Sequence, residues 1–123
     1  MPSIADRLRK RLIWMTSDEE MLGTARDRLP AEWSLTAALC VEDFDDWQEI
    51  LLHRFLVLDL GDPAIDHGVI DEIRREYQLN IPIFCYGGSE EQRLAARAAR
   101  ADRFFAQEEI LTRLPDFLHQ FSW

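Results

Sequence analysis

The stretch from Phe55 to Pro63 constrains the fold more than any other part of this chain. Four apolar residues, Phe55 to Leu58, lead directly into Asp59, and turn-forming residues follow as far as Pro63. A continuous apolar run without polar alternation is typical of a parallel strand that is covered on both faces. Ligands and reacting groups of open α/β sheets collect beyond the carboxyl ends of such strands. We therefore expect a central strand that presents Asp59 at this edge; the competing interpretation is that Asp59 caps the turn that follows.

Strand-like and helix-like segments alternate along the rest of the chain. The strand-like segments are short and apolar, whereas the helix-like segments repeat apolar residues at spacings of three and four. This alternation predicts an α/β fold with a doubly wound, five-stranded parallel sheet and helices on both faces. The expected strands span residues 11–15, 35–40, 55–59, 81–86 and 102–106. The expected helices span residues 17–29, 44–51, 64–78, 90–101 and 108–121.

Local signals predict where three of these helices begin. Ser17 with Glu20, and Ser89 with Gln92, have the spacing of a capping box. Pro63 is expected to open the third helix, since proline favours the first helical turn.

Two apolar stripes are expected to pack their helices against the sheet. In the second helix the stripe comprises Phe44, Trp47, Ile50 and Leu51. In the fourth helix it comprises Leu94, Ala98 and Ala101.

Composition and charge limit the function classes. The 123 residues are 47% hydrophobic and 30% charged, which fits a single domain over residues 1–123. The net charge of -9 repels phosphate backbones and argues against a nucleic-acid partner. No apolar run is long enough to cross a membrane and no apolar segment follows the N-terminal basic residues, so we expect a cytoplasmic protein without a membrane partner. Cys40 and Cys85 are expected to be core thiols, and the scattered histidines predict no metal site.

With this order of elements, the chain resembles the receiver domain of bacterial response regulators, such as the chemotaxis regulator, over essentially its whole length. Asp59 falls at the position of the phospho-accepting aspartate of two-component signalling. Pro63 matches a proline four residues after that aspartate, and Pro82 matches the proline that begins the fourth strand. The resemblance implies a flavodoxin-like (CheY-like) three-layer sandwich with strand order 2-1-3-4-5.

The chain departs from this family at the positions around the aspartate. The acidic pair that holds Mg²⁺ in receivers aligns with Thr16 and Ser17. The hydroxyl residue at the end of strand four aligns with Gly87, and the lysine of strand five aligns with Gln107. Neutral side chains are poor substitutes for groups that bind metal and phosphoryl oxygens. We therefore expect a pseudo-receiver that keeps the fold and has given up the phosphorylation switch.

The leading hypothesis is a phosphorylation-independent signalling module that binds a protein partner and is not an enzyme, with no cofactor. In receivers the partner face is usually formed by helix four, strand five and helix five. Here this face would be positive and would meet an acidic partner or a second copy of the chain as a homodimer. The competing interpretation is a solvated helix face with local ion pairs. The residues expected to make the face positive are Arg93, Arg97, Arg100 and Arg103.

Other hypotheses keep chemistry at Asp59. In an atypical but active receiver, Asp59 is phosphorylated and Asp18 or Asp62 is recruited to Mg²⁺. A haloacid-dehalogenase-like phosphatase would need a second aspartate where Gly61 stands. A flavodoxin-type binder would need a phosphate loop after the first strand, where residues 17–20 are acidic.

Overall fold

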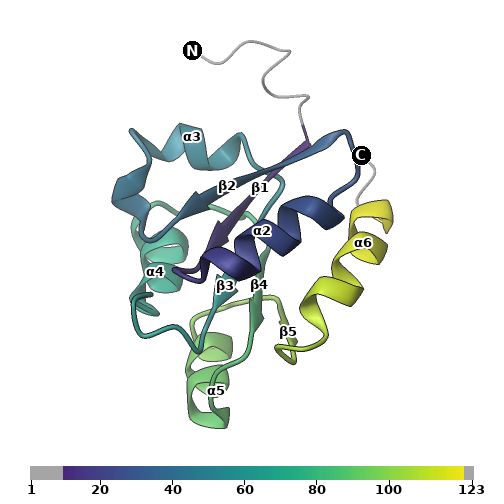
Figure 1. Cartoon of the computed structure of the whole chain (residues 1–123). Helices are drawn as coiled ribbons and strands as arrows, with labels where there is room; N and C mark the ends of the chain where they lie inside the picture. Colours follow the sequence, from purple (N-terminus) through teal and green to yellow (C-terminus); the bar gives the residue numbers. More distant parts are fainter. Residues whose placement is uncertain (1–9, 121–123) are drawn as a thin grey trace.

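The computed structural model describes residues 10–120, which form a parallel five-stranded sheet between two layers of helices (Figure 1). The strand order is β2-β1-β3-β4-β5, and every neighbouring pair is parallel. The predicted fold class and strand order are therefore confirmed. The strands are β1 (Lys10–Met15), β2 (Trp33–Ala38), β3 (Phe55–Asp59), β4 (Ile83–Tyr86) and β5 (Arg103–Phe105). The helices are α2 (Glu19–Arg28), α3 (Trp47–Leu51), α4 (Gly68–Asp71), α5 (Glu90–Ala98) and α6 (Ile110–Gln120). A 3-10 turn, η1 (Val41–Asp43), precedes α3, and a π-helical turn, η2 (Glu72–Glu76), continues α4.

The central strand β3 is buried along its whole length and divides its side chains between two apolar layers. Phe55 and Val57 pack with residues of α2 and α6, whereas Leu56 and Leu58 pack with residues of α3, α4 and α5. This alternation follows from the two-residue period of a strand. Because both faces are covered, the apolar run needs no polar residue until Asp59.

The helix-start predictions have mixed outcomes. The capping box of Ser89 and Gln92 is confirmed at α5, with both reciprocal hydrogen bonds present. The box predicted at Ser17 is wrong, because Asp18 caps α2 and accepts the backbone N–H of Met21 at 3.1 Å.

Pro63 does not open a helix, so this prediction is also wrong. The chain crosses residues 60–67 in turns, and α4 begins only at Gly68. Asp62 accepts the N–H of Ala64 at 2.9 Å, and Asp66 accepts the N–H of Gly68 at 2.8 Å. Aspartate side chains thus satisfy backbone groups that a helix would otherwise use.

Both predicted apolar stripes are wrong in part. In α3, Ile50 is buried, but Trp47 and Leu51 are 44% and 48% exposed. This helix has only five residues, so little more than one turn meets the sheet. In α5, Ala96 faces the core and Leu94 is 58% exposed, because the helix is rotated relative to the predicted stripe.

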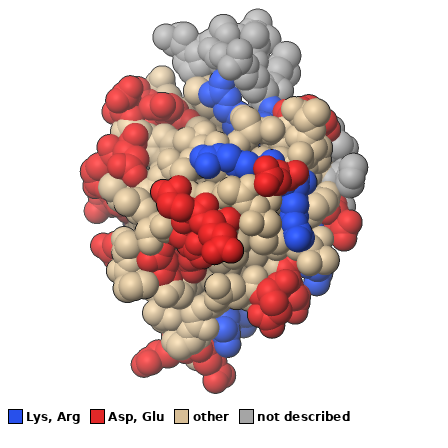
Figure 2. All heavy atoms as spheres, in the orientation of Figure 1, with Lys and Arg blue, Asp and Glu red and all other residues tan. Residues whose placement is uncertain are grey.

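Acidic side chains cover much of the visible surface (Figure 2), in keeping with the net charge of -9. Among residues 10–120, none of the helices has the length and apolar character needed to cross a membrane. Cys85 is buried in β4, and burial raises the pKa of its thiol to about 12. Cys40 is half-buried and was expected in the core. Phe121, the predicted end of the last helix, lies outside the described residues.

Candidate functional site

Asp59 lies at the carboxyl edge of the sheet, beside the residue that follows β1. Since β1 and β3 are neighbours in the sheet, Thr16 is brought next to this carboxylate. The Thr16 hydroxyl donates to Oδ2 of Asp59 at 2.8 Å, and the backbone N–H of Gly61 donates to Oδ1 at 3.2 Å. Asp59 is only 9% exposed. Its two oxygens are therefore held by neutral donors, and the N–H of Gly61 belongs to the turn that Asp59 caps in the competing interpretation.

Asp62 folds inward and forms the second half of the cluster. Its Oδ2 accepts the backbone N–H of Ser17 at 2.6 Å and the Ser17 hydroxyl at 2.7 Å. The N–H of Ser17 is the main cause that lowers the pKa of Asp62. Oγ1 of Thr16 lies 3.3 Å from the same oxygen, but its single proton has the shorter bond to Asp59. Thr16 and Ser17 thus bind the two carboxylates where receivers place metal-binding acids.

Asp18 does not join this cluster. Its Oδ1 is used to cap α2, and its backbone N–H donates to the Thr16 hydroxyl at 3.1 Å. Within residues 10–120, no three His, Cys, Asp or Glu side chains gather in an arrangement that would hold a metal ion. Mg²⁺ prefers an octahedral set of oxygens that are free to coordinate. Thr16 and Ser17 supply hydroxyls where receivers supply acidic ligands, and both use Oδ2 of Asp59 or Asp62 as an acceptor, so the donor set differs from that of a receiver-type Mg²⁺ site.

A buried aromatic pair lies beside Asp59, and no pattern in the sequence predicted it. Tyr86 is opposite Asp59 in the register of β3 and β4 and is fully buried. Nε1 of Trp14 donates to the Tyr86 hydroxyl at 3.0 Å, and the two rings meet edge to face at 5.7 Å. Burial raises the pKa of Tyr86, and the negative charge of Asp59 adds to this effect. Tyr86 therefore remains protonated beside the carboxylate cluster.

Gly87 and Gln107 lie close together at the end of β4. A Cβ on Gly87 would lie 3.5 Å from Oε1 of Gln107. Gly87 and Gly88 both have positive φ, 66° and 78°, which disfavours threonine or serine. A Cβ on Gly88 would lie 2.7 Å from Cβ of Leu60. Backbone atoms thus pack tightly between the ends of β3 and β4.

The four predicted partner-face arginines make different local contacts. Arg97 and Arg103 line a hollow beside Phe104, and Cζ of Arg97 lies 5.1 Å from the centre of the Phe104 ring. Arg93 instead donates to the carbonyl of Gly88 at 2.8 Å. Arg100 lines a different hollow, next to η2. The other residues that line the hollow of Arg97 are Ala101, Asp102, Phe105, Glu109 and Arg113.

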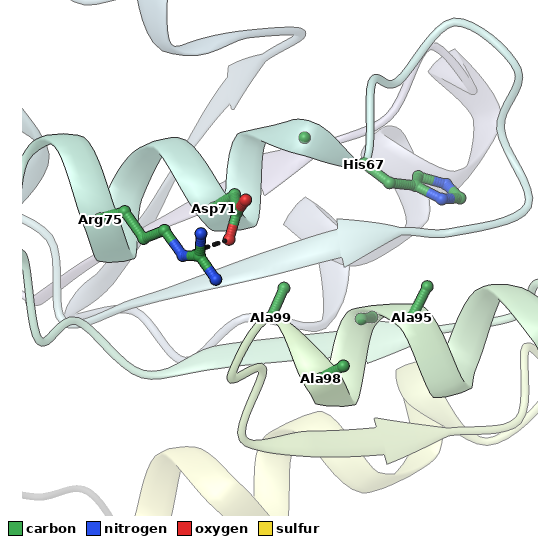
Figure 3. A pocket seen from close by; sticks show the side chains of 8 residues that line it. His67, Asp71, Arg75, Ala95, Ala98 and Ala99 are labelled. Carbon is green, nitrogen blue, oxygen red and sulfur yellow. Dashed lines mark ion pairs between the residues drawn. The ribbon is translucent and has the colours of Figure 1, made fainter.

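A separate groove runs between α4 and α5 (Figure 3). His67, Asp71 and Arg75 lie on one wall, and Asp71 pairs with Arg75 at 3.4 Å. The opposite wall carries only small side chains, and the carboxylate cluster does not line the groove. These small residues are Ala95, Ala96, Ala98 and Ala99.

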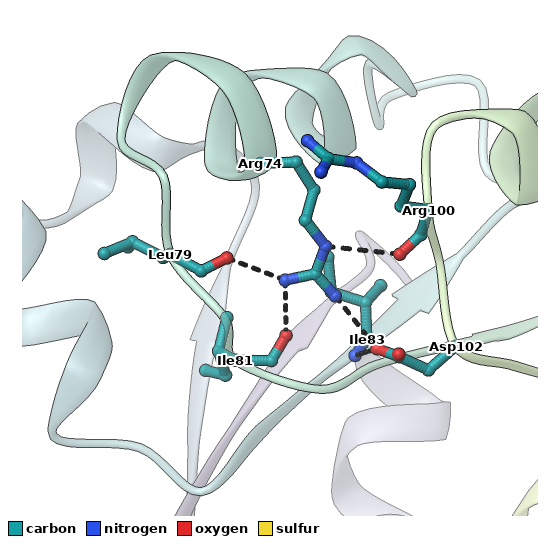
Figure 4. A network of polar contacts seen from close by, with 6 residues as sticks. All are labelled: Arg74, Leu79, Ile81, Ile83, Arg100 and Asp102. Atoms are coloured by element: carbon teal, nitrogen blue, oxygen red, sulfur yellow. Dashed lines mark hydrogen bonds and ion pairs between the residues drawn. The ribbon is translucent and has the colours of Figure 1, made fainter.

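A buried arginine ties η2 to the β4 and β5 ends of the sheet (Figure 4). Nη1 of Arg74 donates to the carbonyls of Leu79 and Ile81, both at 2.8 Å. Its other nitrogens reach the carbonyl of Arg100 at 3.2 Å and Oδ2 of Asp102 at 2.9 Å. The same Asp102 oxygen accepts the N–H of Ile83 at 2.7 Å. No local sequence signal predicted this network, because its members come from distant segments.

The chain matches no family model, and no curated protein is similar to it. It is similar to solved response regulators. A signal receiver domain from Bermanella marisrubri gives a TM-score of 0.70 at 18% identity, over 89% of this chain and 95% of that one. The phosphorylated cyanobacterial phytochrome response regulator RcpA gives a TM-score of 0.69 at 12% identity, over 91% of this chain and 90% of that one. The Mn²⁺-bound form of the response regulator Rcp1 gives a TM-score of 0.69 at 13% identity, over 91% of this chain and 93% of that one. At these identities, the likeness shows that the chain has the fold of response regulator receiver domains.

Proposed function

We propose that this chain is a receiver-fold signalling module that binds a protein partner without phosphorylation at Asp59. The observation that carries the proposal is the hydrogen bonding of Asp59 and Asp62 by Thr16 and Ser17. Neutral donors here supply hydrogen bonds to the acidic cluster at the positions where receivers have further acidic groups. This hydrogen bonding supports a site that works without a bound ion.

The charges around Asp59 support the same proposal. A phosphoryl group would bring about −1.5 to −2 charges to this edge, next to the ionised Asp62. Gln107 stands where receivers have a lysine and carries no compensating charge. Phosphoryl transfer depends largely on positioning and on neutralising charge. We therefore assign this module no catalytic role and no cofactor.

The hollow beside Phe104 supports an acidic partner. Arg97 and Arg103 line it from α5 and β5, and Arg113 adds a third guanidinium from α6. Asp102 and Glu109 also line it, and Glu109 pairs with Arg113 at 3.6 Å, so three guanidinium groups face two carboxylates. Arginine and aromatic side chains are enriched among residues that dominate binding energy. A second copy of this strongly acidic chain fits the same chemistry. The proposal includes a cytoplasmic setting, which rests on the sequence expectations.

A phosphorylation assay tests the proposal. The purified chain is incubated with acetyl phosphate and Mg²⁺, and its intact mass is measured. An active receiver treated in parallel is the positive control, and Asp59→Asn gives the background. We expect the parent chain and Asp59→Asn to be indistinguishable. A phosphoryl mass on the parent that is absent from Asp59→Asn would refute the proposal.

A second candidate is an atypical receiver that is phosphorylated on Asp59. The inward position of Asp62 favours it, since both carboxylates contact Oγ1 of Thr16. Phosphorylated RcpA and Mn²⁺-bound Rcp1 are among its structural neighbours. This candidate predicts phosphorylation that is lost in Asp62→Asn, because Asp62 would then serve the metal ion.

A further inference from the structure

Helix α3 presents two large apolar side chains to solvent. Trp47 and Leu51 are 44% and 48% exposed and lie four residues apart, so they are neighbours on one side of the helix. Ile50 is buried and packs α3 against the core, and the side chains of Trp47 and Leu51 are not part of the core.

The segment that carries this apolar pair is strongly acidic, and basic charge enters beyond its end, where Arg11 acts on His53. Between Leu29 and His53 the sequence contains no lysine or arginine. Figure 2 shows acidic side chains at the left of the view, where η1 and α3 lie in Figure 1. We define the α3 patch as the apolar side chains of Trp47 and Leu51 together with five acidic residues of η1, α3 and the turn between them. These acidic residues are Glu42, Asp43, Asp45, Asp46 and Glu49.

Short as it is, α3 is held firmly in place. Oδ1 of Asp46 accepts the N–H groups of Gln48 and Glu49 at 2.8 and 3.2 Å. Nδ1 of His53 donates to the carbonyl of Glu49 at 3.0 Å, and Nε2 accepts the Thr36 hydroxyl at 2.9 Å. A surface whose backbone is already ordered loses less conformational entropy when it binds.

We propose that the α3 patch is a docking surface for a basic amphipathic helix of a partner protein. Trp47 and Leu51 would contact the apolar side of that helix, and the surrounding carboxylates would pair with its lysines and arginines. The same acidic charge repels nucleic acids and anionic membranes. This surface follows the edge strand β2, whereas Arg103 belongs to the opposite edge strand β5. The inference therefore concerns a second surface and does not depend on whether Asp59 is phosphorylated.

A pair of charge-inverted peptides tests this proposal. Each peptide has about 18 residues, long enough to form a helix, and carries the same leucine stripe. One peptide has lysines at all other positions, and the other has glutamates. Each peptide is titrated into the ¹⁵N-labelled full chain. We expect saturable amide shifts at Trp47, Gln48 and Leu51 with the lysine peptide only.

Matched variants identify the residues responsible. Trp47→Ala should weaken binding of the lysine peptide about tenfold. Leu94→Ala removes an apolar side chain that is 58% exposed on α5 and should leave binding unchanged. The double change Glu42→Gln and Asp45→Asn should weaken binding most at low salt. The amide spectrum of each free variant checks that its fold is retained.

Three outcomes would overturn the proposal. The first is no saturable binding of the lysine peptide, or equal binding of the glutamate peptide. The second is a set of shifts that falls outside η1 and α3. The third is a folded Trp47→Ala variant that binds as tightly as Leu94→Ala. None of these outcomes bears on the phosphorylation assay, so the two proposals fail independently.

Discussion

The Thr16 hydroxyl donates a hydrogen bond of 2.8 Å to Oδ2 of Asp59 across the ends of two neighbouring strands. A neutral hydroxyl thus stands beside this carboxylate at a position that aligns with an acidic residue of receivers. The hydrogen bond also links β1 to β3 at the edge where the chemistry of this fold is concentrated. The nearly buried carboxylate of Asp59 therefore depends on Thr16.

Removal of this donor should destabilise the fold. Thr16→Val keeps the shape of the side chain and leaves Oδ2 of Asp59 without its closest protein donor. We expect the free energy of unfolding to fall by about 1–3 kcal/mol, measured by urea denaturation. Thr112→Val, on the exposed side of α6, is the matched control and should change stability by less than about 0.5 kcal/mol. Equal effects of the two substitutions would contradict this role of Thr16.

The turn after β4 makes a second prediction. Gly88→Ala adds a Cβ 2.7 Å from Cβ of Leu60 at a φ of 78°. Both the contact and the backbone conformation are unfavourable, so we expect a loss of more than about 1 kcal/mol. Gly23→Ala, in α2 with no atom within 4 Å of the added Cβ, should stabilise the chain by about 0.5–1 kcal/mol. Thermal unfolding of both variants measures these stability changes, which should have opposite signs. A Gly88→Ala variant as stable as the parent chain would contradict the prediction and show that the turn rearranges to accept the Cβ.

The buried guanidinium of Arg74 makes a third prediction. Arg74→Met leaves the carbonyls of Leu79 and Ile81 without their donor and Asp102 without its ion pair. We expect a loss of about 3 kcal/mol in the free energy of unfolding. Arg75→Met breaks an exposed pair with Asp71 and should cost less than about 0.5 kcal/mol. Similar losses for the two variants would mean that the Arg74 network adds little.

His53 should make stability depend on pH. Burial is the main cause that lowers the pKa of this imidazole, and the charge of Arg11 lowers it further. As pH falls below about 6.5, the unfolded chain binds a proton that the folded chain excludes, so stability decreases. His53→Gln should reduce this dependence between about pH 7 and pH 5, measured by urea denaturation at each pH. If the free energy of unfolding of His53→Gln depends on pH as steeply as that of the parent chain, His53 is not the source of this pH dependence.

Strong, repeated patterns made the fold predictable. The apolar run of β3 and the alternation of strands and helices predicted the sheet, because burial on both faces requires such a run. The position of Asp59 at the carboxyl edge of the sheet followed from the same topology. These features depend on the order of strands and helices along the chain, and that order can be predicted from local sequence patterns.

The details of the site depend on contacts between distant segments. The capping-box spacing predicted that Ser17 caps a helix. Its hydroxyl instead donates a hydrogen bond to Asp62, which is 45 residues away in the chain. Arg74 and Asp102 are 28 residues apart, and no local pattern joins them. Helical spacing placed Trp47 inward, because spacing alone does not give the length of α3 or the part of it that meets the sheet.

A titration with Mg²⁺ and beryllofluoride, a phosphoryl mimic, tests the central claim most directly. Backbone amide shifts of the ¹⁵N-labelled chain are followed around Asp59. We expect no saturable shift at millimolar metal, because Thr16 and Ser17 already satisfy the carboxylates of Asp59 and Asp62. Saturable shifts at Asp59, Gly87 and Phe104 would show that the phosphorylation switch survives and would contradict the claim.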